Sequence, residues 1–433
     1  MRSFGDTESI FTNMDVLNPN EEAYRPRDLP EREQELNEIH SALRPLTLGA
    51  TPINVLIYGE TGQGKTVAVD LKTDELQAWA EEEDVDLTVL TVQCKGYNKS
   101  YHAMAYLVKR LREERFGPGE ETPKGYQIKE LFLQMRQELE AIGGTVIVVL
   151  DEIDSLGEDD YILYELPRAT FDNVKLSVIG ITNDLTYRDN LDSDVRSSLG
   201  EDEIVFAPYN ASQLMNILAR RAAGSLRDTG FSCADCARPD CPHDVDERAE
   251  NLVSDVIEQD DGVIELAAAL AAQETGDARL ALQILYRAAR FVDDRADEVI
   301  TAADIREAQA YLEEKAVVSG IQTLPVQKRL ALLAVTHEAA MNAVPAGTTA
   351  LYDRYKDYSA TIDTGAVSRR RFRDLLNDLC HQGLLSRELG GRGQGQENRY
   401  MLDVQYQMIV NHLPEEDSRL DEIVAEIHEA AGS

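Results

Sequence analysis

Residues 59–66 read Gly59-Glu60-Thr61-Gly62-Gln63-Gly64-Lys65-Thr66, a G-x-x-x-x-G-K-T pattern. A short apolar run from Asn54 to Tyr58 precedes the pattern and fits a buried strand. A stretch with helical spacing follows it, from Lys65 to Ala80. Strand, glycine loop and helix in this order form the context that a phosphate-binding P-loop requires. A chance glycine-rich turn is the alternative, but such a turn does not need this context.

The chemistry of a P-loop explains these residue types. Glycines let the backbone bend and bring its N–H groups close to phosphate oxygens, and the helix N-terminus adds a dipole that favours anions. Lys65 can reach the β- and γ-phosphates of a nucleotide, and the Thr66 hydroxyl can hold Mg²⁺. We therefore expect residues 59–66 to bind a nucleotide.

A pair of carboxylates follows the apolar run from Thr145 to Leu150, which fits a central parallel strand. Asp151 can bind Mg²⁺ through water, and Glu152 can orient and polarise an attacking water molecule. A solvated pair of loop carboxylates is the alternative. Asn183 lies just beyond the next predicted strand, Lys175 to Ile181, where its amide can position water near the γ-phosphate.

Strands and helices alternate through the first half of the chain, which predicts a parallel sheet with helices on both faces. Further strands are expected at residues 86–94 and 203–207, and helices at 100–115, at 126–142 and from Pro30 to about Leu43. From Ala211 to about Glu314 the pattern is helical. Arg279 opens a helix there, where the dipole would favour an acid, so it is a candidate phosphate contact from a lid domain.

The last part of the chain predicts a winged helix-turn-helix. Ser368 is the expected N-cap of a helix with one apolar face, followed by two strands with a glycine-rich tip at residues 390–395. Residues 354–399 carry nine basic and six acidic side chains, a local charge of +3. Such a reversal indicates a DNA contact, and a protein-binding winged helix is the alternative. The arginines of this helix are Arg369, Arg370, Arg371 and Arg373, and Arg392 lies in the glycine-rich tip.

The whole chain of 433 residues has a formal charge of −36. Either acidic partners or adaptation to high salt would explain this, and the spread of acids over every segment favours salt adaptation. The N-terminus lacks an apolar signal region and no run approaches a membrane span, so we expect a cytoplasmic protein without a membrane partner.

A cysteine cluster lies in an apparent inserted loop, residues 229–246. Cys233, Cys236, Cys241 and His243 offer four soft ligands within eleven positions, and Zn²⁺ takes four such ligands tetrahedrally. The alternatives are a loop with free thiols or a redox pair at Cys233 and Cys236. The spacing matches no common zinc finger closely.

These residues together resemble the archaeal replication initiators of the origin recognition complex and cell-division-control type. The resemblance covers nearly the whole chain and rests on the P-loop, Asp151-Glu152, Asn183, the run Gly276-Asp277-Ala278-Arg279 and the winged helix. More specific parts are Tyr24 to Glu33 and the run from Leu191 to Leu199 with the strand after it.

The resemblance implies an AAA+ ATPase fold with an α-helical lid and a winged-helix domain. By this resemblance, Lys65 and Thr66 would belong to the Walker A motif, and Asp151 and Glu152 to the Walker B motif. Asn183 would be the sensor-one residue and Arg279 the sensor-two residue. Arg32 and Tyr209 would belong to the nucleotide site, Arg32 at its adenine end. The cofactors would be ATP or ADP with Mg²⁺. The winged helix would bind origin DNA through Arg369, Arg370, Arg371 and Arg373 in the major groove and through Arg392 in the minor groove. Residues between Cys94 and Tyr126 would include a second DNA contact.

The implied function is origin binding regulated by ATP and ADP, with slow hydrolysis and with loading of the minichromosome maintenance helicase. Double-stranded origin DNA, that helicase and other copies of the chain on DNA would be the partners. Asp194 stands where a basic residue is often found, which leaves Arg196 as the candidate arginine finger. Two other functions stay open: a nucleotide-switched DNA-binding regulator, and an AAA+ protein remodeller.

The expected domains are a nucleotide-binding base at residues 1–208, a helical lid at 209–314 with the cysteine insert, and a winged helix at 315–433.

Overall fold

The structure is a computed structural model, and it describes residues 9–19, 24–97, 99–157, 159–187, 191–200, 202–233, 236, 243, 248–258, 262–390, 397–416 and 418–431. The chain divides into two compact units, Met1–Ala308 and Gln309–Ser433. The long helix α12, Ala302–Gln322, contains the boundary between them. The expected boundaries after residues 208 and 314 stay predictions. Within the described residues, no helix is long and apolar enough to cross a membrane.

A five-stranded sheet forms the centre of the first unit, with the strand order β2-β3-β4-β1-β5. Every neighbouring pair in it is parallel, as the sequence predicts. The carboxyl ends of all five strands therefore meet at one edge. The strands are β1 Val55–Tyr58, β2 Leu87–Gln93, β3 Gly144–Asp151, β4 Val174–Thr182 and β5 Asp202–Val205.

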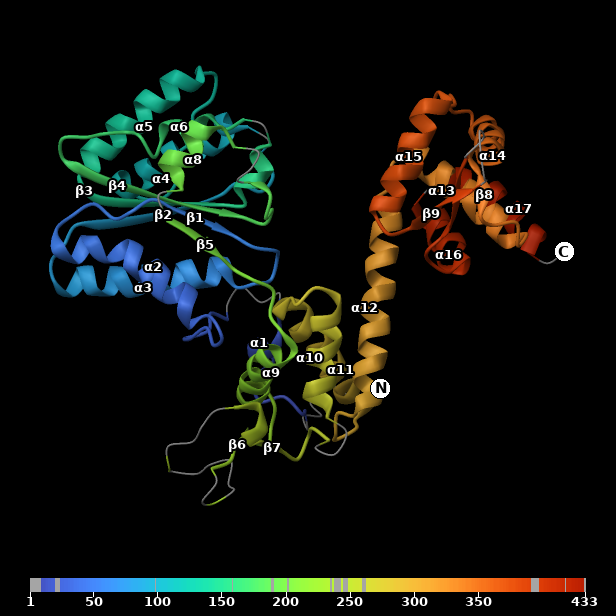
Figure 1. Ribbon diagram of the computed structural model, residues 1–433, viewed down its shortest axis with the longest axis horizontal. Helices are drawn as coiled ribbons and strands as arrows, with labels where there is room; N and C mark the ends of the chain where they lie inside the picture. The colour runs from blue at the N-terminus through green and yellow to red at the C-terminus, as the bar shows by residue number, and fades with distance from the viewer. Residues whose placement is uncertain are drawn as a thin grey trace. The chain divides into compact units, whose positions relative to one another are not determined.

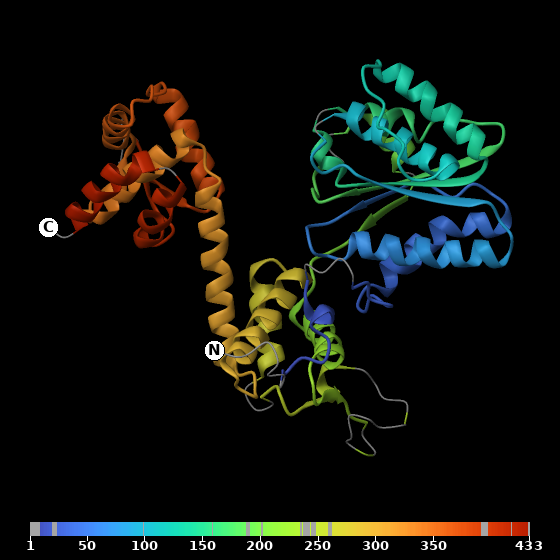
Figure 2. The same cartoon turned by 180° about the vertical axis from the view of Figure 1, so that it is seen from behind.

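Helices cover both faces of this sheet, and two separate apolar cores result. Along β3, Ile147 and Val149 point to the core shared with one helix pair, whereas Val146, Val148 and Leu150 point to the other core. Figure 1 and the reverse view in Figure 2 show α2 and α3 on one face and α4 and α5 on the opposite face. The helices are α2 Glu33–Leu43, α3 Lys65–Glu82, α4 Ser100–Phe116, α5 Ile128–Ile142, α6 Tyr161–Glu165 and α8 Ser193–Leu199.

The start of α2 differs from the prediction, since the helix begins at Glu33 and not near Pro30. Glu31 adopts a left-handed backbone conformation, with φ of 68°, and this interrupts the turn that Pro30 would open. The interruption leaves Arg32 as the helix cap, with a side chain only 3% exposed. Arg32 is therefore held inside the protein and not on a solvated helix.

The remainder of the first unit is helical except for a small antiparallel sheet. Its helices are α9 Ala211–Ser225, α10 Val263–Glu274 and α11 Ala278–Arg295, and the short α1, Met14–Leu17, packs against α9 and α11. The expectation of a helical pattern throughout residues 211–314 is wrong at β6, Thr229–Phe231, and β7, Leu252–Ser254, which pair with each other. Strands of three residues are too short for their apolar alternation to be recognised. Short 3-10 turns occur at Arg44–Leu48, Ile153–Leu156 and Ala249–Asn251.

The second unit has the predicted winged-helix architecture. Helix α15, Arg369–His381, is followed by the antiparallel strands β9, Leu385–Gly390, and β10, Glu397–Leu402, and β8, Ala346–Gly347, pairs with β10. Ser368 caps α15 by accepting a hydrogen bond from the Arg371 backbone, as expected. The other elements are α13 Val326–Ala340, α14 Thr348–Thr361, α16 Tyr406–Glu416, a 3-10 turn at Ser418–Leu420 and α17 Asp421–Ala431.

Candidate functional site

The glycine loop between β1 and α3 has a backbone that only glycine permits. Gly62 and Gly64 have φ of 76° and 86°, in the left-handed region. A Cβ on Gly62 would lie 1.5 Å from Asp277 Oδ1, and one on Gly59 would lie 2.3 Å from the Phe206 carbonyl oxygen. Residues 59–66 thus form a tightly enclosed loop at the carboxyl edge of the sheet. Glu60, Thr61 and Thr66 are exposed on it, whereas Gln63 is fully buried.

Lys65 lies under this loop with its ammonium group held from three sides. Its Nζ donates to the carbonyl oxygens of Gly59 and Glu60, each at 2.7 Å, and to Asn183 Oδ1 at 2.8 Å. The sequence-predicted Lys65 and Asn183 are therefore brought together from α3 and the end of β4. Burial lowers the pKa of Lys65 to about 8, against the opposing field of Asp151.

Thr66 and Asp151 provide two oxygens at one point. Thr66 Oγ1 donates to Asp151 Oδ2 at 3.0 Å, and Asp151 Oδ1 accepts from the Glu152 backbone at 2.9 Å. Burial raises the pKa of the Asp151 carboxyl group. A hydroxyl and a carboxylate in contact, next to a phosphate-binding loop, suit Mg²⁺, which takes few protein oxygens and keeps several waters. The residues present therefore fit a nucleotide with its magnesium ion.

Glu152 follows in a left-handed conformation, with φ of 54°, and its Oε1 lies 3.6 Å from Lys95 Nζ. Asp154 is a residue of this site that the sequence prediction missed. Its Oδ1 accepts from the Thr182 hydroxyl at 3.0 Å and from the Asn183 backbone at 3.1 Å, so it fixes the position of Asn183. The spacing Asp-Glu-x-Asp after an apolar strand was the available signal.

Arg32 and Tyr209 lie behind the glycine loop. The Arg32 guanidinium stacks 3.8 Å from the centre of the Tyr209 ring and donates to Gln63 O, Gln63 Oε1 and Ala207 O. The Tyr209 hydroxyl also donates to Gln63 O, at 3.2 Å, and Gln63 Nε2 donates to Gly276 O at 3.1 Å. This cluster supports the loop from below and joins it to the start of α11. Nucleotide contact by Arg32 stays a prediction.

A cavity of about 540 Å³ opens from the glycine loop toward α9 and α11. This volume lies within the usual range for small-molecule sites. Arg279, which is exposed, reaches it from the start of α11, as the sequence predicts. The prediction missed Arg221, whose guanidinium lies 4.5 Å from the centre of the Tyr24 ring, because basic residues inside a helical pattern give no signal of their own. Other wall residues are Leu29, Pro30, Gly62, Gly64, Val67, Tyr209 and Ile217.

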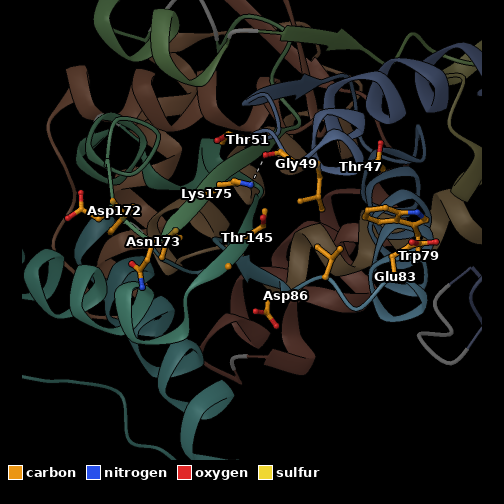
Figure 3. Close-up of a pocket in the computed structure, with 15 residues that line it drawn as sticks. Thr47, Gly49, Thr51, Trp79, Glu83, Asp86, Thr145, Asp172, Asn173 and Lys175 are labelled. Atoms are coloured by element: carbon orange, nitrogen blue, oxygen red, sulfur yellow. Dashed lines mark hydrogen bonds between the residues drawn. The ribbon is translucent and has the colours of Figure 1, made fainter.

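A different cavity, of about 710 Å³, lies at the opposite edge of the same sheet (Figure 3). Thr145 and Lys175 lie near the starts of β3 and β4, and Trp79 near the end of α3. The Lys175 ammonium donates to the Gly49 carbonyl oxygen at 2.7 Å. Ligands of open parallel sheets bind beyond the carboxyl ends of the strands, so this cavity is not part of the nucleotide site.

The cysteine insert brings three of its four predicted ligands together. Cys233 Sγ lies 3.1 Å from Cys236 Sγ and 3.6 Å from His243 Nδ1. These three ligand atoms all lie within 4.8 Å of one another, so the cluster could hold a metal ion. Cys241, the fourth predicted ligand, lies outside the described residues.

Helix α15 exposes the predicted basic face. Arg369, Arg370, Arg371 and Arg373 are all exposed, whereas Phe372 on the opposite face is fully buried. Arg371 lies 4.0 Å from Asp374, and Arg369 donates to the Thr349 hydroxyl. Arg392 lies outside the described residues. Arg196, the candidate arginine finger, is half-buried on α8, and its role stays a prediction.

Three family models match successive parts of the chain. An AAA domain matches residues 51–185, the Cdc6 AAA+ ATPase-type lid domain matches 245–310, and the CDC6 C-terminal winged helix domain matches 319–412. The chain is also 37% identical over 412 residues to ORC1-type DNA replication protein 15 of Haloarcula marismortui, covering 94% of this chain and 93% of that protein. This chain belongs to the ORC1/Cdc6-type archaeal replication initiators.

Two further comparisons agree with this family. The initiator is 35% identical over 420 residues to ORC1-type DNA replication protein 10 of Halobacterium salinarum, covering 95% of this chain and 93% of that protein. Its fold matches the Aeropyrum pernix ORC1 protein, solved in complex with DNA, with a TM-score of 0.79 and 30% identity over 96% of this chain and all of the other. The AAA+ fold, the lid and the winged helix are confirmed, as is the similarity to proteins of halophilic archaea.

Proposed function

We propose that this initiator binds double-stranded origin DNA through its winged helix, under the control of ATP and ADP, and helps to load the replicative minichromosome maintenance helicase. Family membership supports the replication role. Helicase loading and self-association on DNA are proposed from family membership alone. Action in the cytoplasm is part of the same proposal.

Slow, regulatory ATP hydrolysis is part of this proposal, and the residues of the nucleotide site support the hydrolytic role itself. Lys65 would neutralise the β- and γ-phosphates, Thr66 and Asp151 would hold Mg²⁺, and Glu152 would orient the attacking water with help from Asn183. In the structure Lys65 Nζ already bonds to Asn183, and Thr66 to Asp151. Arg279 would sense the γ-phosphate from the helical segment. The cavity is lined by the glycine loop, α9 and α11. A nucleotide bound in it would therefore contact both the loop and these helices.

The exposed arginines of α15 are the observation that supports DNA binding most directly. Arg370 and Arg373 lie on the solvent face of a helix whose other face is packed in the core of the second unit. Within the described residues neither of them has an ion pair. A recognition helix places its N-terminal side chains at base edges in the major groove, and these arginines occupy the first two turns. Arginine also suits bidentate contact with guanine.

The experiment compares a labelled duplex from the cognate origin with random DNA in molar salt, using the full-length protein. We expect tighter binding to origin DNA, and Arg370→Ala and Arg373→Ala each to weaken it by about 1–3 kcal/mol. Arg306→Ala is the control, because Arg306 is an exposed arginine of α12 in the first unit. Equal binding of both duplexes would exclude origin recognition. Unchanged DNA affinity in both α15 variants would favour a protein-binding winged helix and hence a remodeller.

A further inference from the structure

The insert after β6 contains the one cluster of soft metal ligands among the described residues. Cys233 is buried, with 8% of its surface exposed, and Cys236 is half-buried. The 3.1 Å between their sulfur atoms is well beyond a disulfide bond of about 2.05 Å. The two thiol groups and the His243 imidazole therefore converge on one point without a covalent link between the sulfurs.

The spacing of these atoms can be compared with that around a tetrahedral zinc ion. Zinc lies about 2.3 Å from thiolate sulfur and about 2.0 Å from imidazole nitrogen, which separates its ligands by about 3.5–3.8 Å. The distance of 3.6 Å from Cys233 Sγ to His243 Nδ1 agrees with this value. The two sulfurs, now 3.1 Å apart, would have to separate by about 0.7 Å to reach the value of about 3.8 Å expected for two thiolates on zinc. Thiolate and imidazole ligands favour Zn²⁺ over Mg²⁺ or Ca²⁺.

The amino-acid composition of the insert offers few apolar side chains for a core. Residues 232–250 carry six acidic side chains and two arginines, with Val245 as their one large apolar residue. The insert leaves and rejoins a two-stranded sheet where the Ser232 backbone donates to Asn251 O at 2.8 Å. A single pair of strands is marginally stable in water, and each strand here has three residues. A metal ion at Cys233 would close the loop at the point where it leaves the sheet.

We infer that Cys233, Cys236 and His243 bind a structural Zn²⁺ ion. Cys241, which the sequence predicts as a fourth ligand, lies outside the described residues. The ion would hold Cys233, just beyond β6, together with Cys236 and His243. Phe231, the last residue of β6, lines the nucleotide cavity, so the zinc site lies two residues along the chain from that cavity wall. Two cysteine sulfurs and a histidine nitrogen are the ligand types found in structural zinc sites.

The test measures zinc in the full-length protein, purified without chelators, by inductively coupled plasma mass spectrometry. We expect about one equivalent per chain. Cys236→Ser, Cys241→Ser and His243→Asn should each lose most of this zinc. They are preferred to a Cys233 variant, because the buried Cys233 side chain has a packing role of its own. Cobalt reconstitution should give the visible absorption of tetrahedral thiolate-bound Co²⁺ in the unaltered protein and not in the variants.

Cys380→Ser is the matched control, because Cys380 is a half-buried cysteine of α15 in the second unit. That variant should keep its full zinc content. The inference is overturned if folded protein holds no zinc and its insert thiols react as fast as Cys380, or if the three insert variants keep the metal. A Cys233–Cys236 disulfide in acid-quenched protein would overturn it as well. None of these readouts depends on DNA binding or ATP turnover.

Discussion

Lys65 makes nucleotide binding depend on pH. Burial lowers the pKa of this lysine to about 8, so above that value the ligand-free protein increasingly holds a neutral amine. Phosphate oxygens beside the amine favour its charged form, so binding should take up a proton. We predict that ADP affinity falls as pH rises through about 8, by up to tenfold per unit. Calorimetric titration with ADP at about pH 9, in buffers of different ionisation enthalpy, should detect the proton uptake.

Lys72→Gln is the control for this effect, because Lys72 lies on the same helix but pairs with Glu75 at 2.7 Å. It should keep the pH dependence of the unaltered protein.

Since folding lowers the pKa of Lys65, the unfolded chain binds more protons between about pH 8 and the ordinary value of 10.5. Stability should therefore gain from Lys65 as pH rises through that window, while affinity falls. An ADP affinity that is flat across it would contradict the prediction.

Glu152 is predicted to act on turnover and not on binding. Its backbone N–H donates to the carboxylate of Asp151, which is proposed to hold Mg²⁺, and its side chain is not among the groups that bond to Lys65 Nζ. Glu152→Gln keeps the shape but removes the charge that polarises water. ATP turnover should fall about 10²–10⁴-fold, with ADP affinity within about twofold. Glu83→Gln, at the exposed end of α3, should leave both unchanged. Unaltered turnover in Glu152→Gln would assign the base to another residue.

The site residues that could be predicted are those whose role follows from order along the chain. Lys65 follows a glycine loop, and Asp151 and Asn183 each follow an apolar strand, so parallel strands bring them to one edge. The partners of Asp154 and Gln63 could not be predicted, because these side chains bond to residues that are distant in the chain. Asp154 bonds to a backbone 29 positions away, and Gln63 accepts from Arg32 and donates to Gly276, 213 positions away.

The two faces of helix α15 have different roles: its buried face stabilises the second unit, and its exposed arginines are proposed to bind DNA. Phe372 is fully buried and its ring lies 4.8 Å and 5.3 Å from the rings of Tyr355 and Tyr352. We predict that Phe372→Ala lowers the stability of the second unit by about 3–5 kcal/mol. Hydrogen exchange of α15 and α14 should report this loss, while ADP binding to the first unit is kept.

Arg373→Ala, one position along the same helix, is the matched control. Its side chain is exposed, so stability should change by no more than about 0.5 kcal/mol. If Phe372→Ala cost less than about 1 kcal/mol, the packing of α15 on α14 would not be what holds this unit together.

Elements were predictable where their apolar pattern was long. Helix α15 and strand β3 have such patterns. The start of α15 was predicted correctly, and both ends of β3 were predicted to within one residue. Two elements escaped for physical reasons. The sheet of β6 and β7 depends on pairing across residues 232–251, a contact between distant positions. The start of α2 was displaced by the left-handed conformation of Glu31, whose carboxylate accepts from Asn216 at 2.7 Å on α9.

The charge of −36 is a property of the whole molecule, and it should make folding depend on salt. Exposed acids such as Glu81, Glu82 and Glu83 stand side by side on the chain. Their mutual repulsion is screened within about 3 Å in molar salt but extends over about 10 Å at 0.1 M. We predict that the melting temperature falls steadily as potassium chloride is lowered from about 2 M to 0.1 M.

The variant Glu81→Gln/Glu82→Gln/Glu83→Gln separates repulsion from other effects of salt. It should melt higher than the unaltered protein at low salt and equally at high salt, because only the screened repulsion has changed. Salts that are excluded from the protein surface also stabilise folded proteins, but they would raise the melting temperatures of both proteins equally. If the melting temperatures of the two proteins changed with salt in parallel, salt would act through exclusion from the protein surface alone. In that case, repulsion between Glu81, Glu82 and Glu83 would not be the reason that folding depends on salt.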